Sequence, residues 1–357
     1  MKLRPSGYPI PAQRQAGFSL IELMIAITLG LLILAGMLVV FVNTSGARNE
    51  VDRMNRQIEN GRYATELLRD DIQVAGYFGE TDIAKIRGTP GLPSGMPDPC
   101  ATSLTERTWP AGGTVGVILL HVQGIDNFNP ATSTALDSCP TIKSAVKLNT
   151  DVIVVRRVKT CIAGAAGCDA ITAGKPYLQT SLCVNPPTAA SSTTTTHALA
   201  PSPNATEFVH KLKNCTTNAP LRPYVIYLYF VGTDNILKRA EFTGTSMGNV
   251  TPLVDGIENL QLDYGVDTND DGNADAYKSA AVINTLATPA AVVSDWSNVV
   301  AVKINLLARN TDPSPGYTDT KTYPAVGIST PIGDAYRRHV YSTLVRITNV
   351  SGSREKP

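Results

Sequence analysis

The feature that most constrains this chain is an apolar run near its N-terminus. From Phe18 to Val42 the sequence reads FSLIELMIAITLGLLILAGMLVVFV, and its only polar side chains are those of Ser19, Glu22 and Thr28. A helix of about 25 residues spans about 37 Å, enough to cross a bilayer core of about 30 Å. A cleaved secretory signal has a shorter apolar core followed by a small-residue cleavage site. This run is therefore predicted to stay attached as a membrane anchor.

The charges in front of the apolar run predict its orientation. Lys2, Arg4 and Arg14 precede it and no acidic residue does, so the N-terminus should remain cytoplasmic and the C-terminal bulk should face outward. Over the whole chain, 31 basic residues balance 30 acidic ones, for a net charge of +1. With no basic block and a pI near 7.6, nucleic acid is not indicated as a partner.

Residues 43–78 continue the apolar run with an amphipathic helical pattern. No proline interrupts them, and their apolar residues recur at steps of three and four, which is a helical period. The two segments, 18–42 and 43–78, should therefore form one helix of more than about fifty residues, roughly 80 Å long. Gly76 should end it, and Gly30 and Gly36 are points where it can bend.

The remainder of the chain, residues 79–357, is predicted to be a β-rich head. Short runs of β-branched and aromatic residues in near-alternation predict strands, at Val115–Val122, Val152–Val158, Tyr224–Val231, Leu260–Val266, Val299–Leu307 and His339–Ile347. The linkers between them are long and rich in Gly, Pro, Ser and Thr, and the tract Ser191–Thr196 should be exposed loop. These elements predict an α+β fold, with one long helix packed on a mostly antiparallel sheet.

The cysteines predict disulfides. All six follow the membrane segment, none forms a CxxC pair, and no histidine lies at zinc-ligand spacing from them; they are Cys100, Cys139, Cys161, Cys168, Cys183 and Cys215. An even number of scattered cysteines beyond a membrane segment is typical of an oxidising compartment. Fifteen pairings are open to six cysteines, and pairing between sequence neighbours is expected. Free buried thiols are the alternative. The insertion they occupy runs from about residue 100 to 220.

One segment of the head has the spacing of a cation-binding loop. Oxygen-bearing side chains occupy positions 1, 3, 5 and 9 of this segment, which are Asp267, Asn269, Asp271 and Asp275. Gly272 is at position 6, and Asn273 at position 7 would offer its backbone carbonyl. That pattern suits Ca²⁺, with a dissociation constant of about 10⁻⁴–10⁻³ M. Position 12 is Lys278 in place of the usual glutamate. The alternative is a solvated turn between two strands, which the same residue types favour.

Glu22 is unusual because a carboxylate within a membrane helix costs roughly 2.5–3.5 kcal/mol on insertion scales. Glu22 therefore either lies near the membrane interface or has a partner.

The run Gly17-Phe18-Ser19-Leu20-Ile21-Glu22 resembles the type III signal of type IV pilins and of type II secretion pseudopilins. The resemblance implies cleavage after Gly17 by prepilin peptidase, which removes residues 1–17, and N-methylation of Phe18. It also implies that Glu22 pairs with the N-terminal amine of a neighbouring subunit, which fits a buried carboxylate's need for a cation.

Further segments resemble minor pilins of the PilW type. They are Leu67–Ile72, Ala75–Gly79, Asp151–Arg156, Val254–Gly265, Trp296 and Val299–Val302. This resemblance implies a pilin-like fold with large disulfide-containing insertions. It also implies a subunit that helps to prime type IV pilus assembly at or near the filament tip. The implied partners are other minor and major pilins, contacted through the N-terminal helix, prepilin peptidase, the inner membrane before assembly, and a tip adhesin. The implied locations are the inner membrane, with the head in the periplasm, and the extracellular pilus.

No catalytic constellation is found, so the chain is predicted not to be an enzyme. The four histidines are dispersed, and the sequence has no G-x-S-x-G, P-loop or H-E-x-x-H motif. Two alternatives to the pilus subunit remain open. One is a type II secretion pseudopilin, which shares the N-terminal mechanism. The other is a membrane-anchored adhesin or binding protein that uses the cysteine-rich region for recognition.

Overall fold

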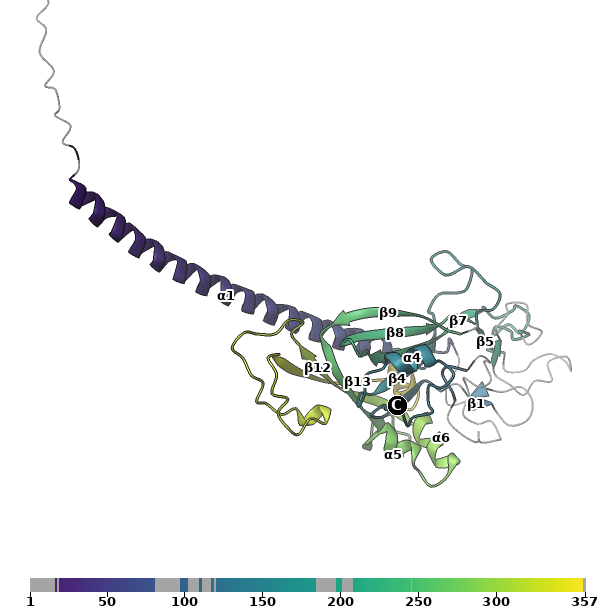
Figure 1. The fold of residues 1–357 in the computed structure, drawn as a ribbon. Helices are drawn as coiled ribbons and strands as arrows, with labels where there is room; N and C mark the ends of the chain where they lie inside the picture. The colour runs from purple at the N-terminus through teal and green to yellow at the C-terminus, as the bar shows by residue number, and fades with distance from the viewer. Residues whose placement is uncertain are drawn as a thin grey trace, which may run out of the picture. The chain divides into compact units, whose positions relative to one another are not determined.

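The computed structural model describes residues 17, 19–80, 97–101, 109–110, 117–118, 120–183, 197–200, 208–244 and 246–355. The chain divides into two compact units, Met1–Asp52 and Arg53–Pro357. Each unit is described below by itself. The second unit is the head (Figure 1).

Helix α1 runs from Leu20 to Gln73 and is 54 residues long, so it covers most of both predicted segments. The predicted bound of residue 78 is wrong, because the chain turns at residues 74–76 and leaves the helix. The prediction that these segments form a single helix is confirmed. Gly76 follows the helix with φ of 72°, a left-handed conformation that glycine adopts without strain. Its N–H donates to the carbonyl of Arg156, which ties the end of the helix to the head.

The larger of the two main sheets has seven strands, all paired antiparallel. Its main path has the order β3-β4-β7-β8-β9, and the pair β5-β6 adjoins the beginning of β7. Its strands are β3 (Val122–Ile125), β4 (Val152–Val158), β5 (Tyr177–Thr180), β6 (His197–Ala200), β7 (Arg222–Val231), β8 (Ile236–Phe242) and β9 (Met247–Asp255).

The second main sheet has four antiparallel strands in the order β11-β10-β12-β13. They are β10 (Ile257–Val266), β11 (Ala276–Ser279), β12 (Val299–Arg309) and β13 (Arg338–Arg346). A separate pair joins β1 (Trp109–Pro110) to β2 (Val117–Ile118). The head therefore contains two main sheets where the sequence suggested one. The predicted strand Val115–Val122 corresponds to β2 and the first residue of β3, and part of it lies outside the described residues.

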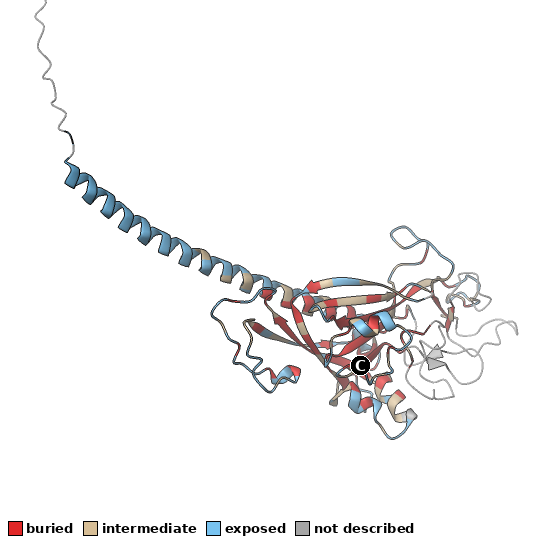
Figure 2. Ribbon diagram, viewed as in Figure 1, coloured by how far each residue is buried: buried red, intermediate tan, exposed pale blue. Residues whose placement is uncertain are grey.

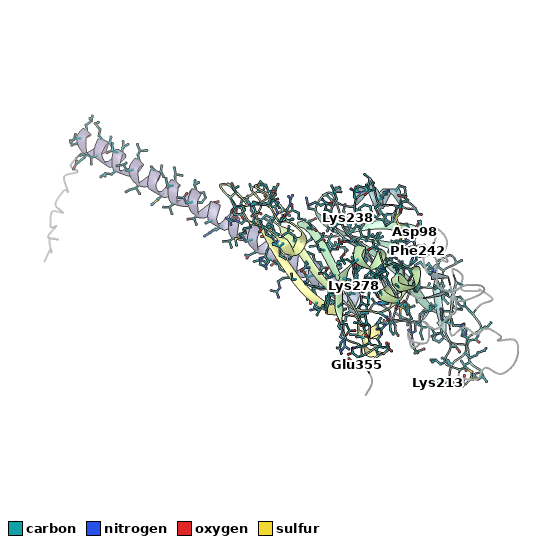
Figure 3. All side chains as sticks on the ribbon, turned by 90° about the horizontal axis from the view of Figure 1, so that it is seen from below. Asp98, Lys213, Lys238, Phe242, Lys278 and Glu355 are labelled. Carbon is teal, nitrogen blue, oxygen red and sulfur yellow. A yellow bond between two sulfur atoms is a disulfide. The ribbon has the colours of Figure 1, made fainter. Side chains whose placement is uncertain are left out.

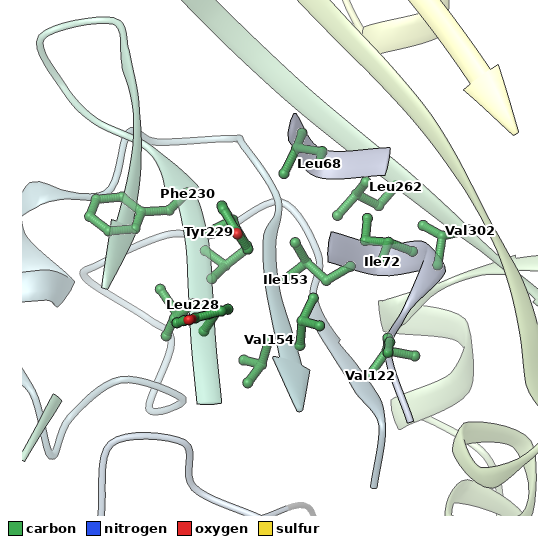
Figure 4. Close-up of a cluster of buried hydrophobic side chains, with 14 of the residues drawn as sticks. Leu68, Ile72, Val122, Ile153, Val154, Leu228, Tyr229, Phe230, Leu262 and Val302 are labelled. Atoms are coloured by element: carbon green, nitrogen blue, oxygen red, sulfur yellow. The ribbon is translucent and has the colours of Figure 1, made fainter. Parts of the chain in front are cut away.

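The second half of α1 packs against both main sheets and forms the centre of the hydrophobic core. Leu68 and Ile72 are fully buried, together with Ile153 on β4 and Val302 on β12. Figure 4 shows these side chains close together, with Leu68 and Ile72 of α1 beside those of the strands. The step of four residues from Leu68 to Ile72 places both on one helix face, as the amphipathic pattern predicts.

Short helices close the loops of the head: α4 (Pro140–Ala145), α5 (Ala280–Asn284), α6 (Pro289–Ser297), the 3₁₀ helix η2 (Pro324–Val326) and α7 (Thr348–Gly352). Helix α6 begins at a threonine cap, where the Thr288 hydroxyl accepts from the Ala291 N–H. Trp296 at its end is buried; its indole N–H donates to Asn284 over 2.8 Å, and its ring lies edge-on to Tyr264. These contacts fix α5 and α6 to β10.

Three disulfides join sequence neighbours: Cys100–Cys139, Cys161–Cys168 and Cys183–Cys215. This pairing is the one expected from the sequence. Cys139 is also the residue that precedes α4, so the first disulfide anchors that short helix. The predicted loop Ser191–Thr196 lies outside the described residues.

Candidate functional site: the assembly helix and the polar clusters of the head

The first half of α1 has an apolar surface on all sides. Its large hydrophobic side chains from Leu20 to Val42 are 52% to 77% exposed, and Figure 2 shows this part of the helix in the colour of exposed residues. Figure 3 shows its side chains standing off the helix on every side. An 18-residue window of α1 has a mean hydropathy of 2.9 and none of it is buried. Length and composition therefore allow this helix to cross a membrane.

Glu22 is the only acidic residue in the first turn of α1, and its contacts are local. Its carboxylate accepts from the backbone N–H of Ser19 over 3.2 Å, while the Ser19 hydroxyl accepts from the N–H of Ile21 over 3.4 Å. This reciprocal arrangement resembles a capping box, in which a serine and a glutamate three residues later satisfy free N–H groups at the start of a helix. Glu22 makes no ion pair with any other described residue, and it is exposed.

The predicted processing site lies just before the helix. Gly17 is exposed and outside any helix or strand, which leaves its backbone accessible. Phe18, the predicted new N-terminus, lies outside the described residues. Thr28 is the remaining polar residue of the apolar run, and its hydroxyl donates to the carbonyls of Met24 and Ile25. Glu22 is the one ionisable side chain of this segment, and it makes no ion pair with a described residue.

In the head, a buried carboxylate fixes the end of α1 to the larger sheet. Asp71 accepts from Arg157 Nε on β4 over 2.9 Å and from the Tyr229 hydroxyl on β7 over 2.8 Å. Further up the helix, the Gln57 amide donates to the backbone carbonyls of Ala308 and Arg337 beside the four-stranded sheet. These polar contacts fix the position of the second half of α1 on both sheets.

A cluster of buried charges holds the four-stranded sheet to the loop between β12 and β13. The side chain of Arg338 is 0% exposed. It donates to Asp319 over 2.9 Å, to both oxygens of Asp334 over 2.6 Å, and to both oxygens of Glu258 on β10. Burial alone would lower the pKa of Arg338, but hydrogen bonds from it to Asp334 and Glu258 raise the pKa above its usual value. The guanidinium therefore stays charged.

The pKa values of two carboxylates in this cluster, Asp319 and Asp334, are lowered. The hydrogen bonds from Arg338 lower the pKa of Asp334. Burial would raise the pKa of Asp319, but hydrogen bonds from Tyr323 and Arg338 outweigh it and lower the pKa. The cluster is a satisfied network of the kind that stabilises a fold, and all of its groups are already paired with one another.

The predicted cation loop joins β10 to β11. Three of its side chains lie together: Asn269 Nδ2 is 3.2 Å from Asp271 Oδ2 and 3.3 Å from Asp275 Oδ1. The backbone N–H of Asn273 donates to Asp271 Oδ1. Hydrogen bonds from Thr268 lower the pKa of Asp275, so this carboxylate is ionised at neutral pH. Asn269, Asp271 and Asp275 thus offer the oxygen donors that a hard cation takes.

Asp267, the first predicted ligand, differs from the others in accepting a hydrogen bond from an arginine. It is buried; Oδ1 accepts from the N–H of Asp270 and Oδ2 accepts from the N–H of Gly272 and from Arg354 Nη1 over 2.7 Å. Burial would raise the pKa of Asp267, but the hydrogen bond from Arg354 and those two N–H groups lower it. Asp267 already accepts hydrogen bonds on both oxygens, and a metal would have to share Oδ1 with the Asp270 N–H or Oδ2 with Arg354.

Lys278, at position 12, pairs with Asp295 on α6 over 2.6 Å and supplies no ligand (Figure 3). Among the described residues, no three His, Cys, Asp or Glu side chains group closely enough to hold a metal ion by themselves, so the amide oxygen of Asn269 would have to take part. The residues fit a cation loop in part, and calcium binding stays a prediction.

Two family models match the chain. Residues 12–38 match the model described as the prokaryotic N-terminal methylation motif. Residues 228–349 match the model described as Type IV Pilus-assembly protein W, and this match runs from β7 through α7. No curated protein matches the chain.

Among solved structures, the type IV-like pilin TTHA1219 from Thermus thermophilus is similar to 57% of this chain and 80% of its own, at 12% identity and a TM-score of 0.27. At that TM-score the similarity adds nothing to the assignment.

The methylation motif and the exposed apolar helix that follows it are features of pilin-class proteins, and they are consistent with anchoring in a membrane. The match over the second half of the head makes the assignment more specific. Over residues 228–349 the chain is similar to the PilW family of type IV pilus-assembly proteins.

Sequence reasoning missed the polar clusters of the head. Arg338 lies just before the predicted strand His339–Ile347, and its partners Glu258, Asp319 and Asp334 are far from it in the sequence or in loops. The one local signal is the spacing of four between Asp334 and Arg338. Arg354 was missed because it lies 87 residues from Asp267. Pairings over such separations leave no mark in one sequence.

Proposed function

We propose that this protein is a minor pilin that takes part in the assembly and priming of a type IV pilus, at or near the filament tip, after prepilin peptidase has removed residues 1–17. Before assembly its first helix crosses the inner membrane and its head lies in the periplasm. The protein acts as a structural subunit through helix packing and carries out no catalysis.

The observation that carries this proposal is the state of Glu22. An exposed apolar helix contains one carboxylate, and that carboxylate makes no ion pair with a described residue. In a bilayer or a filament core, such a group is costly unless a cation comes close. Cleavage after Gly17 would create a cationic amine at Phe18, and the amine of a neighbouring subunit would supply that charge.

The match to a pilus-assembly family over residues 228–349 favours a pilus subunit over a type II secretion pseudopilin. The family match over residues 228–349 lies outside the cysteine-rich insertion, so it does not bear on an anchored adhesin that would bind through that insertion. Subunits of the same pilus are the expected partners.

The test is the substitution Glu22→Gln in the full chain, expressed with the other subunits of the pilus. Removing one partner of a buried ion pair costs about 3–5 kcal/mol, so the amount of the chain in sheared filaments should fall at least tenfold. The amount in the inner membrane should not fall, because glutamine is easier to insert than glutamate.

Thr28→Val is the matched control. Thr28 is the other polar residue within the helical part of the run, but its hydroxyl already donates to Met24 and Ile25, so valine should leave incorporation unchanged. Equal amounts of the Glu22→Gln chain and the wild-type chain in filaments would contradict the proposed role of Glu22.

A further inference from the structure

The sheet edges of the head differ in how they are protected against pairing with another strand. Strands β3, β6 and β11 each have four residues, which is too short to offer a long edge. Strand β9 contains Pro252 and two irregularities in its register with β8. Short strands, prolines and bulges are the usual ways in which proteins block an exposed edge.

Strand β13 has none of these protections. It is nine residues long, it contains no proline, and nine successive residues pair with β12 without a register shift. The order β11-β10-β12-β13 places it at the edge of the four-stranded sheet. Among the described strands, it is the long, regular edge that remains open.

The hydrogen-bond register shows which backbone groups face the free edge. The Ile347 N–H donates to Val300 and the Asn310 N–H donates to Arg337, so the odd-numbered residues of β13 bond to β12. In an antiparallel ladder the residues between them point the other way. The N–H and C=O groups at the free edge are therefore those of Val340, Ser342, Leu344 and Arg346. No hydrogen bond between these groups and another described residue is found.

The side chains along this edge leave it accessible on one face. Tyr341 is directed toward α1, where its ring lies against Gly61 and its hydroxyl donates to the carbonyl of Ile58. On the other face Leu344 is 58% exposed. Arg346 is also exposed and pairs with Glu355, itself exposed (Figure 3). An exposed ion pair of this kind contributes little and exchanges readily.

We propose that the free edge of β13, from Val340 to Arg346, receives an extended strand from the head of a different pilin of the same pilus, which adds a fifth strand to the four-stranded sheet. Main-chain hydrogen bonds supply the affinity, as in other cases of strand addition. The incoming strand places an apolar side chain beside Leu344 and a carboxylate beside Arg346, which displaces Glu355. This inference rests on the proposed function, because it takes another pilus subunit as the partner.

A second copy of this chain fits the edge less well. Strand β13 contains no acidic residue, so antiparallel pairing of two β13 strands would place no carboxylate of one copy's strand beside Arg346 of the other. Opposite charges across a strand pair stabilise it. The charge pattern of the edge therefore favours a different, more acidic strand.

The variants that test the proposal are Leu344→Lys and Leu344→Pro in the full chain. The lysine adds a charge at the edge, and the proline removes an N–H that points away from β12, so neither change touches the ladder within the sheet. Leu148→Lys is the matched control, since Leu148 is a leucine of the head that is 51% exposed. Both Leu344 variants should lower the yield of the chain in complex with the co-expressed minor pilins of the pilus at least tenfold, and Leu148→Lys should not.

Hydrogen exchange supplies the direct readout. The full chain in detergent is measured alone and as the purified complex with those minor pilins. The amides of Ser342, Leu344 and Arg346 should exchange at least tenfold more slowly in the complex, while those of Tyr341 and Thr343 are slow in both. A stable complex without this protection, or one that Leu344→Lys and Leu344→Pro leave intact, would overturn the strand addition and leave the proposed function standing. Failure of the wild-type chain to form any complex with the other pilins would overturn both.

Discussion

The two units of this chain differ in how a charge in an apolar environment is neutralised. In the first half of α1, a single carboxylate, that of Glu22, stands in an apolar exposed helix and makes no ion pair with a described residue. In the head, Arg338 is fully buried and is surrounded by the carboxylates of Glu258, Asp319 and Asp334. A charge removed from water needs a countercharge in both places. The head supplies it from within, whereas Glu22 has no countercharge among the described residues, and we propose that another subunit supplies one.

The largest effect on the head is expected from Arg338→Met. The variant keeps much of the volume of the side chain but removes the cation of Asp319 and Asp334, while Glu258 keeps the more distant Lys147 and Arg309. Breaking a buried ion pair costs about 3–5 kcal/mol. The free energy of unfolding of the head should fall by that amount in thermal or denaturant unfolding of the full chain in detergent. Membrane insertion should not change, because the insertion depends on the first half of α1.

The dependence of this loss on pH sharpens the comparison. The pKa values of Asp319 and Asp334 lie below the ordinary value in the folded head, so their contribution is present above the unfolded pKa of about 3.9 and is lost as the pH falls through the folded values. Without Arg338, burial should instead raise these pKa values, and lowering the pH from 7 toward 5 should then stabilise the variant. A variant with the same pH dependence as the wild type would contradict the assigned role of the cluster.

The disulfides should contribute according to the length of the chain that each closes. Cys100–Cys139 spans 39 residues and Cys161–Cys168 spans 7. Loop-closure entropy predicts a loss of about 4 kcal/mol on replacing the first pair by serines and about 2.5 kcal/mol for the second. Unfolding of the two double variants, measured side by side, checks this order. A larger loss for the shorter loop would show that packing around the disulfide outweighs chain entropy.

Calcium should have a smaller effect. If the loop after β10 binds Ca²⁺ with a dissociation constant of about 10⁻⁴–10⁻³ M, about 2 mM calcium stabilises the head by about 0.6–1.8 kcal/mol. Asp271→Asn and Asp275→Asn should remove the increase in Tm. Asp312→Asn is the control, because Asp312 is an exposed acid of the head that lies outside the loop. A wild-type Tm that calcium does not change would favour the solvated turn, with Arg354 as the countercharge of Asp267.

Local patterns predicted the elements of this fold better than their assembly. The apolar and amphipathic periods of residues 18–42 and 43–78 predicted α1 because helical packing repeats within a few residues. Alternation predicted β12 and β13 for the same reason. It did not predict β8, where Lys238, Arg239 and Glu241 interrupt the apolar pattern and long-range pairing with β7 and β9 decides the structure. Nor did it predict that the strands divide into two sheets.

The candidate site follows the same rule. The residues of the N-terminal motif lie side by side in the sequence, so the resemblance to a prepilin signal was visible at Gly17, Phe18 and Glu22, and residues 12–38 match the methylation motif. The roles of these three residues stay predictions. The open edge of β13 could not, because it depends on which strands end up as neighbours. Sequence spacing is informative where one short segment carries the chemistry, and it is silent where the fold brings distant segments together.

The most direct test of the central claim is mass spectrometry of filaments sheared from the cell surface. The account predicts a peptide that begins at N-methylated Phe18, at low abundance beside a major pilin, and its absence when Gly17→Ala blocks processing. Detection of the protein only in membranes, with residues 1–17 still attached, would contradict the account and would favour an anchored binding protein. A processed chain confined to the cell envelope would contradict its presence in the filament.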